Sequence, residues 1–579
     1  MRVIDFENAS CKHCYTCVRA CSVKAIQIKD AQATIMDHYC ILCGKCLEVC
    51  PQNAKTFVSD LDMVKAWLAG GQRVVVSLAP AYLGILPYDR PGQVVDALLR
   101  LGFAEVRETA EGAAYVTAEY MRLLEEGQMD NIITTCCPSV NDLVEKYYPE
   151  LVPYLAPVVS PMIAHGKLIK GREDPGTKVV FIGPCVAKKK EAEGDDRTTG
   201  YVDAVLNFAE VEAWMTERGI AIKACGDLAP ANPDPKVNRL YPVTCGVVSS
   251  VLAKKRTDGY KKIFVDGVED CKEVFEDMKK DLIHGCFIEA NMCEGGCIKG
   301  PAINKMHISK YKATMVVEEQ IVHEDPAYPE LPEGIVMGKR FRPRPFNDPM
   351  PTEAEIAEIL KATGKYDKTQ ELNCGACGYP SCREKAIAVW QGKAEPEMCL
   401  PYIYEKAQSM SNVVLYTMPD MAIMVDEAFQ IVEFNRKAEK VFGMSRSQAR
   451  EKLIFELMDP ADFEQVFETH QRILKKQISL PDKGMTLLEN LVYVEEHGTV
   501  LGIFHDITDE MAEHDRQLEM RMDTVAVAQQ VIDKQMMVAQ QIAGLLGETT
   551  AETKVILTQL RDAMVKDERF KDQPDKEAI

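Results

Sequence analysis

The sequence predicts a multidomain α/β protein whose central body is flanked by cysteine-rich segments. Three observations support this prediction. The chain has 579 residues, more than one hydrophobic core usually supports, so about three to five domains are expected. Its 21 cysteines fall mostly into short-spaced groups. Strand-like apolar runs alternate with helical patterns through the middle of the chain, and the apolar content of 46% suits compact folding.

The composition limits which partners and which cellular compartment are expected for the protein. The formal charge is −20 without a long basic run, which argues against a cationic face for nucleic acid. Residues 1–6 lack the apolar stretch of a signal peptide, and no uncharged run of about 18 apolar residues predicts a membrane span. We therefore expect a cytoplasmic protein with no membrane partner. Grouped thiols in such a chain are typical of metal ligands rather than disulfides, and they suggest an anaerobic source.

The α/β body is predicted from about residue 61 to residue 350. Strand-like runs occur at residues 73–77, 131–134, 178–182 and 262–265, and their alternation with helical patterns favours parallel pairing. A proline-rich segment at residues 325–351 is interpreted as a linker. Thr352 and Glu355 then form a predicted capping box at the start of a helix.

A cysteine ladder occupies the first 60 residues. The spacing C-x2-C-x2-C-x3-C occurs twice, at Cys11, Cys14, Cys17 and Cys21 and again at Cys40, Cys43, Cys46 and Cys50. In this pattern the fourth cysteine reaches the neighbouring cluster. The predicted ligand sets are Cys11, Cys14, Cys17 and Cys50 for one 4Fe-4S cluster, and Cys40, Cys43, Cys46 and Cys21 for the other. Zinc is the alternative, which the tandem repeat disfavours. The segment resembles bacterial two-cluster ferredoxins, although Ser22 replaces their usual proline.

Three loops of the body each carry cysteines after a strand-like run. They span residues 134–139, 183–191 and 289–297, and strand ends are where open α/β sheets place their sites. Gly295 and Gly296 permit close backbone approach to a bulky group. Any single loop is equally compatible with a buried cysteine that acts as a small hydrophobe.

Together the three loops resemble the signature motifs of the iron-only (FeFe) hydrogenase family, over about residues 63–340. The resemblance implies that Cys137, Cys185 and Cys293 hold a 4Fe-4S cluster and that Cys297 bridges it to a 2Fe subcluster with CO and CN ligands. It implies that Cys136 is the proton-donating thiol and that Lys188 donates to a cyanide ligand. Glu191 matches a supporting carboxylate and Glu119 could continue a proton path, although both could instead be solvated surface groups. The cofactor wall would include Ala79, Pro80, Gly183, Pro184, Asn291 and Met292.

The chain also departs from the family pattern. Gly183 and Asn291 replace methionines, Val140 replaces a common tryptophan, and Ala156 replaces a serine of the usual proton path. Residues 299–301 replace a glycine-rich run. Changes around a metal site alter potential and turnover while leaving binding possible, so slow or sensory chemistry is expected.

A further cysteine group follows the body at Cys374, Cys377, Cys382 and Cys399. It resembles a small 4Fe-4S module of anaerobic redox proteins, with zinc as the alternative, and it could pass electrons between its neighbours. The remaining thiols are expected to pack in the core; they are Cys225, Cys245, Cys271 and Cys286.

The region after Cys399 contains no cysteine. A predicted hairpin spans residues 422–434, Asn435 and Gly443 are expected to cap and end a helix, and residues 486–494 and 500–507 form a second predicted strand pair. This order, closing with residues 506–508, resembles a PAS sensor domain; without cysteine, a flavin–thiol adduct is excluded.

Beyond it lies a heptad seam of Leu518, Met522, Val525, Gln529, Ile532, Met536, Ala539, Ala543 and Leu546. We interpret this seam as a parallel dimeric coiled coil with Gln529 as its polar register position. The alternative is an amphipathic helix that lies on its own domain. No kinase, DNA-binding or phosphatase motif follows, so a separate output protein is expected.

The predicted architecture therefore has five parts: a two-cluster ferredoxin domain (1–60), a hydrogenase-like domain (61–350), a 4Fe-4S module (351–408), a PAS domain (409–510) and a coiled-coil tail (511–579). The predicted cofactors are four 4Fe-4S clusters and the 2Fe subcluster. The expected function is a sensory FeFe hydrogenase that slowly catalyses 2H⁺ + 2e⁻ = H2, exchanges electrons with a ferredoxin-like carrier and signals through a homodimer. A catalytic ferredoxin-linked hydrogenase and an iron–sulfur scaffold without diiron are the alternatives.

Overall fold

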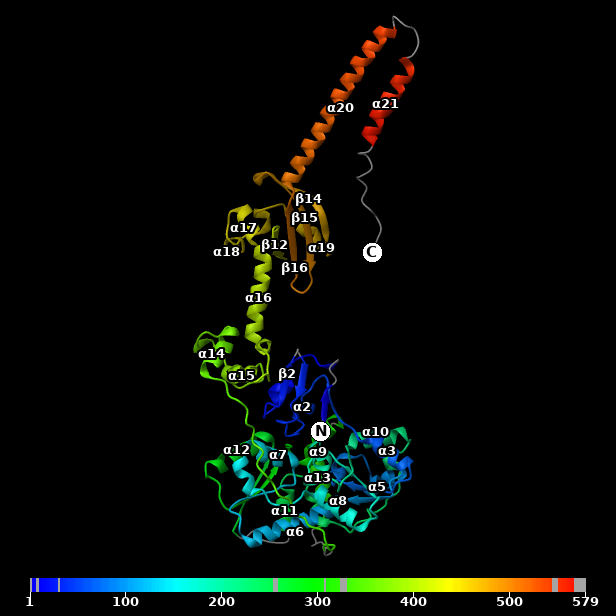
Figure 1. Ribbon diagram of the computed structural model, residues 1–579, viewed down its shortest axis with the longest axis vertical. Coiled ribbons are helices and arrows are strands. Elements are labelled where there is room, and N and C mark those ends of the chain that lie inside the picture. Colours follow the sequence, from blue (N-terminus) through cyan, green and yellow to red (C-terminus); the bar gives the residue numbers. More distant parts are fainter. Residues whose placement is uncertain are drawn as a thin grey trace. The chain divides into compact units, whose positions relative to one another are not determined.

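The computed structural model describes residues 3–6, 10–29, 32–253, 259–306, 309–322, 331–543 and 550–566. Its contacts divide the chain into two compact units, Met1–Ile403 and Tyr404–Ile579, which Figure 1 shows as a mixture of helices and sheets. Each unit is described by itself.

The cysteine ladder at the start of the first unit folds around short elements. Strand β1 (Ile4–Phe6) pairs antiparallel with β4 (Lys55–Phe57), and β2 (Ile26–Lys29) pairs with β3 (Gln32–Ile35). Helices α1 (Thr16–Ala20) and α2 (Lys45–Glu48) each contain the third cysteine of one ladder copy. Both helices begin after a residue in the left-handed region, Tyr15 and Gly44, so the backbone curls tightly where the thiols are closely spaced.

Two parallel sheets form the body. The larger has the order β6-β5-β8-β9, with β5 (Val74–Leu78), β6 (Glu105–Glu108), β8 (Lys178–Ile182) and β9 (Ala204–Leu206). The smaller has the order β10-β11-β7, with β7 (Ile132–Ile133), β10 (Lys261–Asp266) and β11 (Cys286–Asn291). The predicted parallel pairing is confirmed. Every residue of β5 and β11 is buried, as expected for parallel strands that are covered on both faces.

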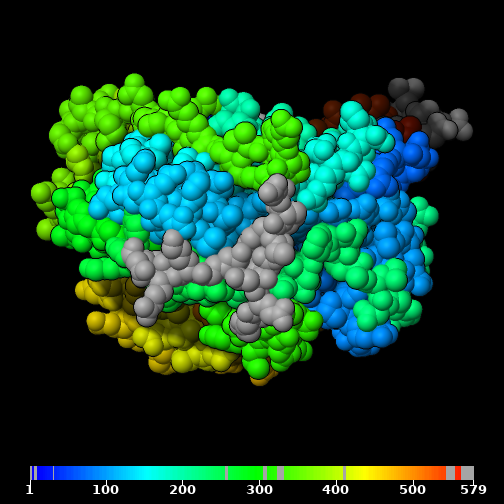
Figure 2. Space-filling model, turned by 90° about the horizontal axis from the view of Figure 1, so that it is seen from below, coloured from blue at the N-terminus to red at the C-terminus, as the bar shows by residue number. Residues whose placement is uncertain are grey.

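Helices cover these sheets and complete the core. They are α3 (Leu61–Ala69), α4 (Tyr82–Ile85), α5 (Gly92–Arg100), α6 (Ala110–Glu126), α7 (Pro138–Tyr147), α8 (Pro161–Arg172), α9 (Ala187–Glu193), α10 (Phe208–Glu217), α11 (Gly246–Leu252), α12 (Val268–Lys279) and α13 (Lys310–Glu319). The light-blue segment that includes α6 reaches the surface on the face shown in Figure 2.

The proline-rich segment predicted as a linker is fastened to the body where the structure describes it; residues 323–330 lie outside the described residues. Gly338 forms an isolated antiparallel β-bridge with Val158, and the backbone N–H of Arg344 donates to the Glu145 backbone oxygen at 2.6 Å. Backbone hydrogen bonds and ion pairs at several points therefore hold a segment that has neither helix nor strand. The composition of the segment could not reveal this attachment to the body, because the bonding partners are separated from it by about 150 residues or more in the sequence.

The small cysteine module contains α14 (Glu353–Ala362) and α15 (Cys382–Trp390), and α16 (Leu400–Thr417) begins directly after Cys399. The predicted capping box at Thr352 and Glu355 is confirmed. Trp390 Nε1 donates to Glu355 Oε1 at 3.1 Å, so the cap also joins the module's two helices.

The second unit contains a five-stranded antiparallel sheet of order β13-β12-β16-β15-β14. Its strands are β12 (Met421–Asp426), β13 (Ile431–Phe434), β14 (Ile473–Leu480), β15 (Met485–Val494) and β16 (Thr499–Asp506). Helices α17 (Arg436–Phe442), α18 (Arg446–Ala449) and α19 (Ala461–Thr469) complete this domain. Both hairpins are confirmed, as are the cap at Asn435 and the left-handed helix end at Gly443. The sequence predicts the second strand of the first hairpin from Phe429, but Phe429 has φ 61° and the strand begins at Ile431.

Two helices follow the sheet, α20 (Thr508–Ala543) and α21 (Thr550–Lys566), and they contact each other. The partly covered positions of α20 include five of the predicted seam, Val525, Gln529, Ile532, Met536 and Ala539. Leu546 lies outside the described residues. Coiled-coil dimerisation stays a prediction. Within the described residues, the model contains no helix of sufficient length and apolarity to span a bilayer.

Candidate functional site

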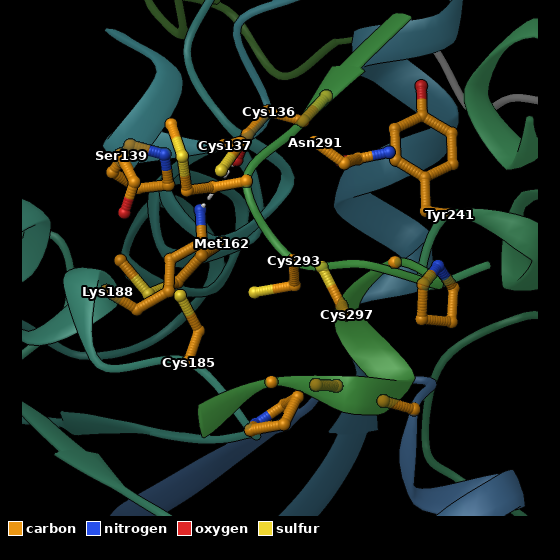
Figure 3. Close-up of a pocket in the computed structure, with 18 of the residues that line it drawn as sticks. Cys136, Cys137, Ser139, Met162, Cys185, Lys188, Tyr241, Asn291, Cys293 and Cys297 are labelled. Carbon is orange, nitrogen blue, oxygen red and sulfur yellow. Dashed lines mark hydrogen bonds between the residues drawn. The ribbon is translucent and has the colours of Figure 1, made fainter. Parts of the chain in front are cut away.

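Four cysteines from three separate loops surround one cavity in the body. Cys137, Cys185, Cys293 and Cys297 all line it, and its volume is about 100 Å³, several times what a single water needs. Figure 3 shows these four side chains around a common space. The loops follow the carboxyl ends of β7, β8 and β11, so two different parallel sheets deliver thiols to the same place, as strand ends in α/β folds commonly do.

The local structure around each thiol follows from the sequence. Cys137 is the N-cap of α7, with Pro138 at the first helical position, where proline's missing N–H costs nothing. Gly296 has φ 79°, and a Cβ there would lie 2.5 Å from Pro242 O. A Cβ on Gly300 would lie 2.3 Å from Pro184 O. Glycine is therefore required at both positions for the third loop to close around the cavity.

The thiols are held in an apolar setting. Burial raises the pKa of Cys185 to about 11, and burial together with neighbouring thiols raises the pKa of Cys293 and Cys297. Such thiols become good ligands when a metal centre supplies the compensating positive charge. A set of four thiols around a hollow of this size fits an iron–sulfur cluster by its donor chemistry.

Lys188 brings a positive charge to the cavity wall. Its Nζ donates to Cys136 O at 3.2 Å and to Glu191 Oε2 at 2.7 Å. Burial alone would lower the pKa of Lys188, but the Glu191 carboxylate and the Cys185 thiol outweigh burial and raise it. Glu191 lies behind Lys188, outside the cavity lining, where Ser160 Oγ also donates to its Oε2 at 2.9 Å. Lys188 is therefore a fixed ammonium group that faces the cavity.

The other predicted wall residues divide into two groups. Ala79, Pro80, Pro184, Asn291 and Met292 line the cavity. Gly183 does not: its N–H donates to Leu206 O, and a Cβ would lie 2.6 Å from the Phe181 ring. Gly183 thus packs behind the wall, and the space that a side chain would need there is filled by Phe181.

Glu119 and Cys136 are not in contact. Glu119 lies on the outer side of α6, where Arg122 Nε donates to its Oε2 at 2.9 Å. The next residue, Tyr120, is fully buried, and its hydroxyl lies 3.2 Å from Cys136 Sγ. Tyr120 was missed by sequence reasoning. The signal was the helical spacing of Val116, Tyr120 and Leu123, which places these three residues, and not Glu119, on the buried face.

Glu289 is a second buried group that the motif search did not single out. Its carboxylate accepts from Val248 N at 2.8 Å and from Asn291 Nδ2 at 3.1 Å. Burial raises the pKa of Glu289 to about 7, although these hydrogen bonds lower it. Glu289 thereby fixes the side chain of Asn291, which lines the cavity.

The ferredoxin-like ladder lies directly against this site. Cys43 lines the same cavity, and a Cβ on Gly44 would lie 2.2 Å from Pro301. Within the ladder, Cys17 interacts with Cys50 and Cys11. The second group is Cys21, Cys40, Cys43 and Cys46, whose members influence each other's pKa. Cys50 therefore neighbours Cys17 of the other copy, and Cys21 neighbours Cys43 and Cys46 of the other copy; the full ligand sets stay a prediction.

The small module also lies against the ladder. Cys377 and Tyr379 pack in one apolar cluster with Cys17 and Cys21. Arg19 donates to Ala376 O at 3.2 Å, and a Cβ on Gly378 would lie 2.7 Å from Val18. Inside the module, Lys365 Nζ donates to Cys399 Sγ at 3.3 Å. Cysteine groups thus follow one another from the cavity through the ladder to the module.

The four cysteines expected to pack in the core are at least half-buried. Cys225, Cys271 and Cys286 are buried, and Cys245 is half-buried. Over the described ranges, no three His, Cys, Asp or Glu side chains are placed to hold one isolated metal ion. The four ligands of a cubane cluster surround a larger object than one ion.

Family models match four segments of the chain. Residues 72–301 match the iron only hydrogenase large subunit, C-terminal domain, and residues 10–56 match a 4Fe-4S dicluster domain. Residues 370–401 match a model for an Fe-S cluster segment, and residues 410–507 match the PAS fold.

Relatives of two kinds are found. The periplasmic Fe hydrogenase large subunit of Nitratidesulfovibrio vulgaris is 29% identical over 370 residues, 52% of this chain and 86% of that protein. The cytosolic Fe-S cluster assembly factor NAR1 of Eremothecium gossypii is 25% identical over 227 residues, 34% of this chain and 48% of that protein. Among solved structures, a variant of the FeFe-hydrogenase HydA1 from Chlamydomonas reinhardtii has 20% identity and a TM-score of 0.37, covering 45% of this chain and 88% of that one.

Proposed function

The chain is a relative of the iron-only hydrogenases that also carries a PAS domain, and from this premise we propose that it is a sensory hydrogenase. It interconverts hydrogen with protons and electrons, slowly, and passes its redox state through iron–sulfur clusters to the PAS domain. The observation that carries this proposal is the convergence of four thiols, Cys136 and the Lys188 ammonium on one cavity.

The ligand roles follow from the family resemblance and suit the donor set. Cys137, Cys185 and Cys293 would hold a 4Fe-4S cluster, and Cys297 would be the thiolate shared with the 2Fe subcluster. When bound, the diiron group with its CO and CN ligands supplies an open metal position at which hydrogen is split or formed. Ala79 and Pro80 supply the backbone wall beside it.

Lys188 orients the assembly electrostatically. Its ammonium group faces the cavity, where it can donate to an anionic ligand such as cyanide. Glu191 and Cys136 O hold the ammonium in place. Cys136, which lines the cavity beside the ligand cysteines, would hold and exchange the proton at its Sγ.

Electrons leave by the sequence of neighbouring cysteine groups. Cys43 of the second ladder group lines the cavity, and Cys377 of the module packs in one apolar cluster with cysteines of both ladder groups. We place the two ladder clusters between the cavity and the module. An external ferredoxin-like carrier, a signalling output protein, dimerisation through α20, the cytoplasmic location and the anaerobic source all stay predictions from sequence.

Reconstitution tests the proposal. The full-length chain is loaded anaerobically with iron and sulfide and then with a synthetic diiron precursor, and infrared spectra are recorded under hydrogen and under inert gas. Sharp CO and CN bands that shift under hydrogen are expected. Their absence after verified 4Fe-4S loading would exclude the proposed function. The turnover rate then separates a sensor from a bulk catalyst.

An iron–sulfur scaffold without diiron is the second candidate, favoured by the similarity to the NAR1 assembly factor. A scaffold needs ligand thiols but no proton-carrying thiol and no ammonium at the wall. Cys136 and the Lys188–Glu191 pair therefore support the hydrogenase proposal over the scaffold.

A further inference from the structure

A buried phenol contacts the cysteine to which we assign proton transfer. Tyr120, on α6, is fully buried, and its hydroxyl lies 3.2 Å from Cys136 Sγ. The ring packs edge-on against Phe287 of β11, with centroids 5.8 Å apart. The contact joins a helix, a strand and the first cysteine loop, so the packing leaves the hydroxyl little freedom to turn away.

The hydrogen bonds around the Tyr120 hydroxyl indicate which atom is the donor in this contact. The Thr135 N–H donates to the Tyr120 oxygen at 2.9 Å. The phenol has one proton to donate, and two acceptors are near: Cys136 Sγ at 3.2 Å and Thr135 Oγ1 at 3.5 Å. The second distance exceeds the usual O–H···O range of about 2.5–3.0 Å. The Tyr120 proton therefore points to the sulfur of Cys136.

The backbone on either side of the sulfur is held as well. Asn141 Nδ2 donates to Thr135 O at 3.0 Å, and Lys188 Nζ donates to Cys136 O at 3.2 Å. Thr135 Oγ1 lies within hydrogen-bond distance of Val158 O, at 2.9 Å. With the main chain fixed in this way, rotation about χ1 of Cys136 and about its C–S bond decides where the thiol proton points.

We propose that Tyr120 is a positioning residue: it donates a hydrogen bond to Cys136 Sγ and thereby directs the thiol proton into the cavity. This inference rests on the proposed function, because it assigns Cys136 to the transfer of protons. The Cys136 sulfur then accepts a hydrogen bond from the phenol on the side of Tyr120. Its own S–H is free to point into the cavity. Such orientation lowers the barrier although Tyr120 itself lines no part of the cavity and acts through Cys136.

Tyr120→Phe tests the proposal, because it keeps the ring against Phe287 and removes the hydroxyl. The readout is the S–H stretching band of Cys136 in full-length protein that carries 4Fe-4S clusters but no diiron group, identified by subtracting the spectrum of Cys136→Ala. We expect this band to shift and broaden in Tyr120→Phe, since the sulfur loses its donor. With the diiron group loaded, turnover should fall roughly ten- to a hundredfold while the CO and CN bands stay in place.

Tyr82→Phe is the matched control. The Tyr82 hydroxyl is also buried in the body, but it donates to Glu108 at 3.1 Å and does not touch the cysteine loop. This variant should leave the S–H band of Cys136 and the turnover as in the parent protein.

An unchanged S–H band in Tyr120→Phe overturns the inference. If that variant fails to take up clusters, difluorotyrosine at position 120 replaces it. This residue keeps the ring and the hydroxyl, and its more acidic phenol is a stronger hydrogen-bond donor. It should shift the S–H band in the direction opposite to Tyr120→Phe, and an unmoved band again overturns the inference. Failure of the proposed function is distinguishable: the CO and CN bands would then be absent from the parent protein itself.

Discussion

At the scale of single residues, neighbouring positions on one helix have opposite environments. Glu119 pairs with Arg122 on the outside of α6, whereas Tyr120 is buried against Cys136. Glu191 is only 3% exposed and is bonded to Lys188 and Ser160. The supporting carboxylate Glu191 and the proton-path candidate Glu119 therefore differ in burial, and burial sets what a charge contributes to stability.

Glu191→Gln should destabilise the protein. The amide keeps the size of the side chain but leaves the buried Lys188 ammonium without its carboxylate, at a cost of about 3 kcal/mol. The apparent Tm of the metal-free protein, followed by tryptophan fluorescence, measures the loss. Glu119→Gln is the matched control and should change stability by about 0.5 kcal/mol or less. Equal effects of the two substitutions would contradict this account of Glu191.

Cys136→Ala should abolish most turnover and leave the diiron group bound. The thiol is assigned to proton transfer and not to metal ligation, and a positioned proton donor contributes roughly 10²- to 10⁴-fold to a rate. Hydrogen evolution with a chemical reductant and infrared spectra of the same sample measure the two effects. Disappearance of the CO and CN bands would instead make Cys136 a structural part of the binding site.

At the scale of elements, the sheet of the second unit contains a buried carboxyl group. Glu489 on β15 is 2% exposed and lies opposite Lys476 of β14. Burial, the carboxylate of Asp462 on α19 and, more weakly, that of Asp459 together raise the pKa of Glu489 to about 8, although Lys476 opposes them. The side chain is therefore protonated in the folded domain at neutral pH.

This carboxyl should make the PAS-like sheet less stable as the pH rises from about 4.3 to about 8. In that window an unfolded glutamate has lost its proton while the folded one retains it, so unfolding releases a proton and higher pH favours it. Hydrogen exchange of the β15 amides in the full-length chain, corrected for intrinsic rates, measures the effect. Glu489→Gln should reduce the slope. In this variant His505 should still cause a smaller loss of stability with rising pH, since Asp420 raises the pKa of His505. A slope that Glu489→Gln leaves unchanged would rule out this assignment.

At the scale of the whole first unit, two glycines mark the contacts between its cysteine-bearing parts. Gly44 meets Pro301 of the body, and Gly378 meets Val18 of the ladder; both have positive φ. At each contact the neighbouring residue lies closer to the glycine backbone than a side chain on that glycine would allow. These close approaches keep successive cysteine groups adjacent, which the proposed electron transfer through the unit requires.

Gly44→Ala should therefore separate the ladder from the body. The added Cβ would lie 2.2 Å from the Pro301 ring, at a φ of 74° that alanine rarely adopts. We expect full cluster loading but slower electron transfer between the diiron site and an external acceptor, and weaker magnetic coupling between clusters by electron paramagnetic resonance. Gly127→Ala is the control, since it shares a positive φ but meets nothing within 4 Å. Unchanged coupling in Gly44→Ala would show that this contact does not set the spacing.

Much of the architecture could be predicted because its signals are local. Helix caps at Thr352 and Asn435 depend on residues three positions away, and both are confirmed. Parallel strands such as Lys178–Ile182 are recognisable by continuous apolar runs. The prediction of a linker before residue 351 failed to foresee its fixation to the body, because its partners are distant in sequence.

The sequence by itself determined which residues can bind iron, because thiol spacing within a loop is a local property of the chain. It also determined the order of the segments and the strands that deliver the loops. Only the tertiary structure decided that three loops share one cavity, that Tyr120 and not Glu119 reaches Cys136, and that Gly183 lies behind the wall. Those outcomes depend on how elements pack against partners far away in the chain, and packing is a property of the folded molecule and not of any local pattern.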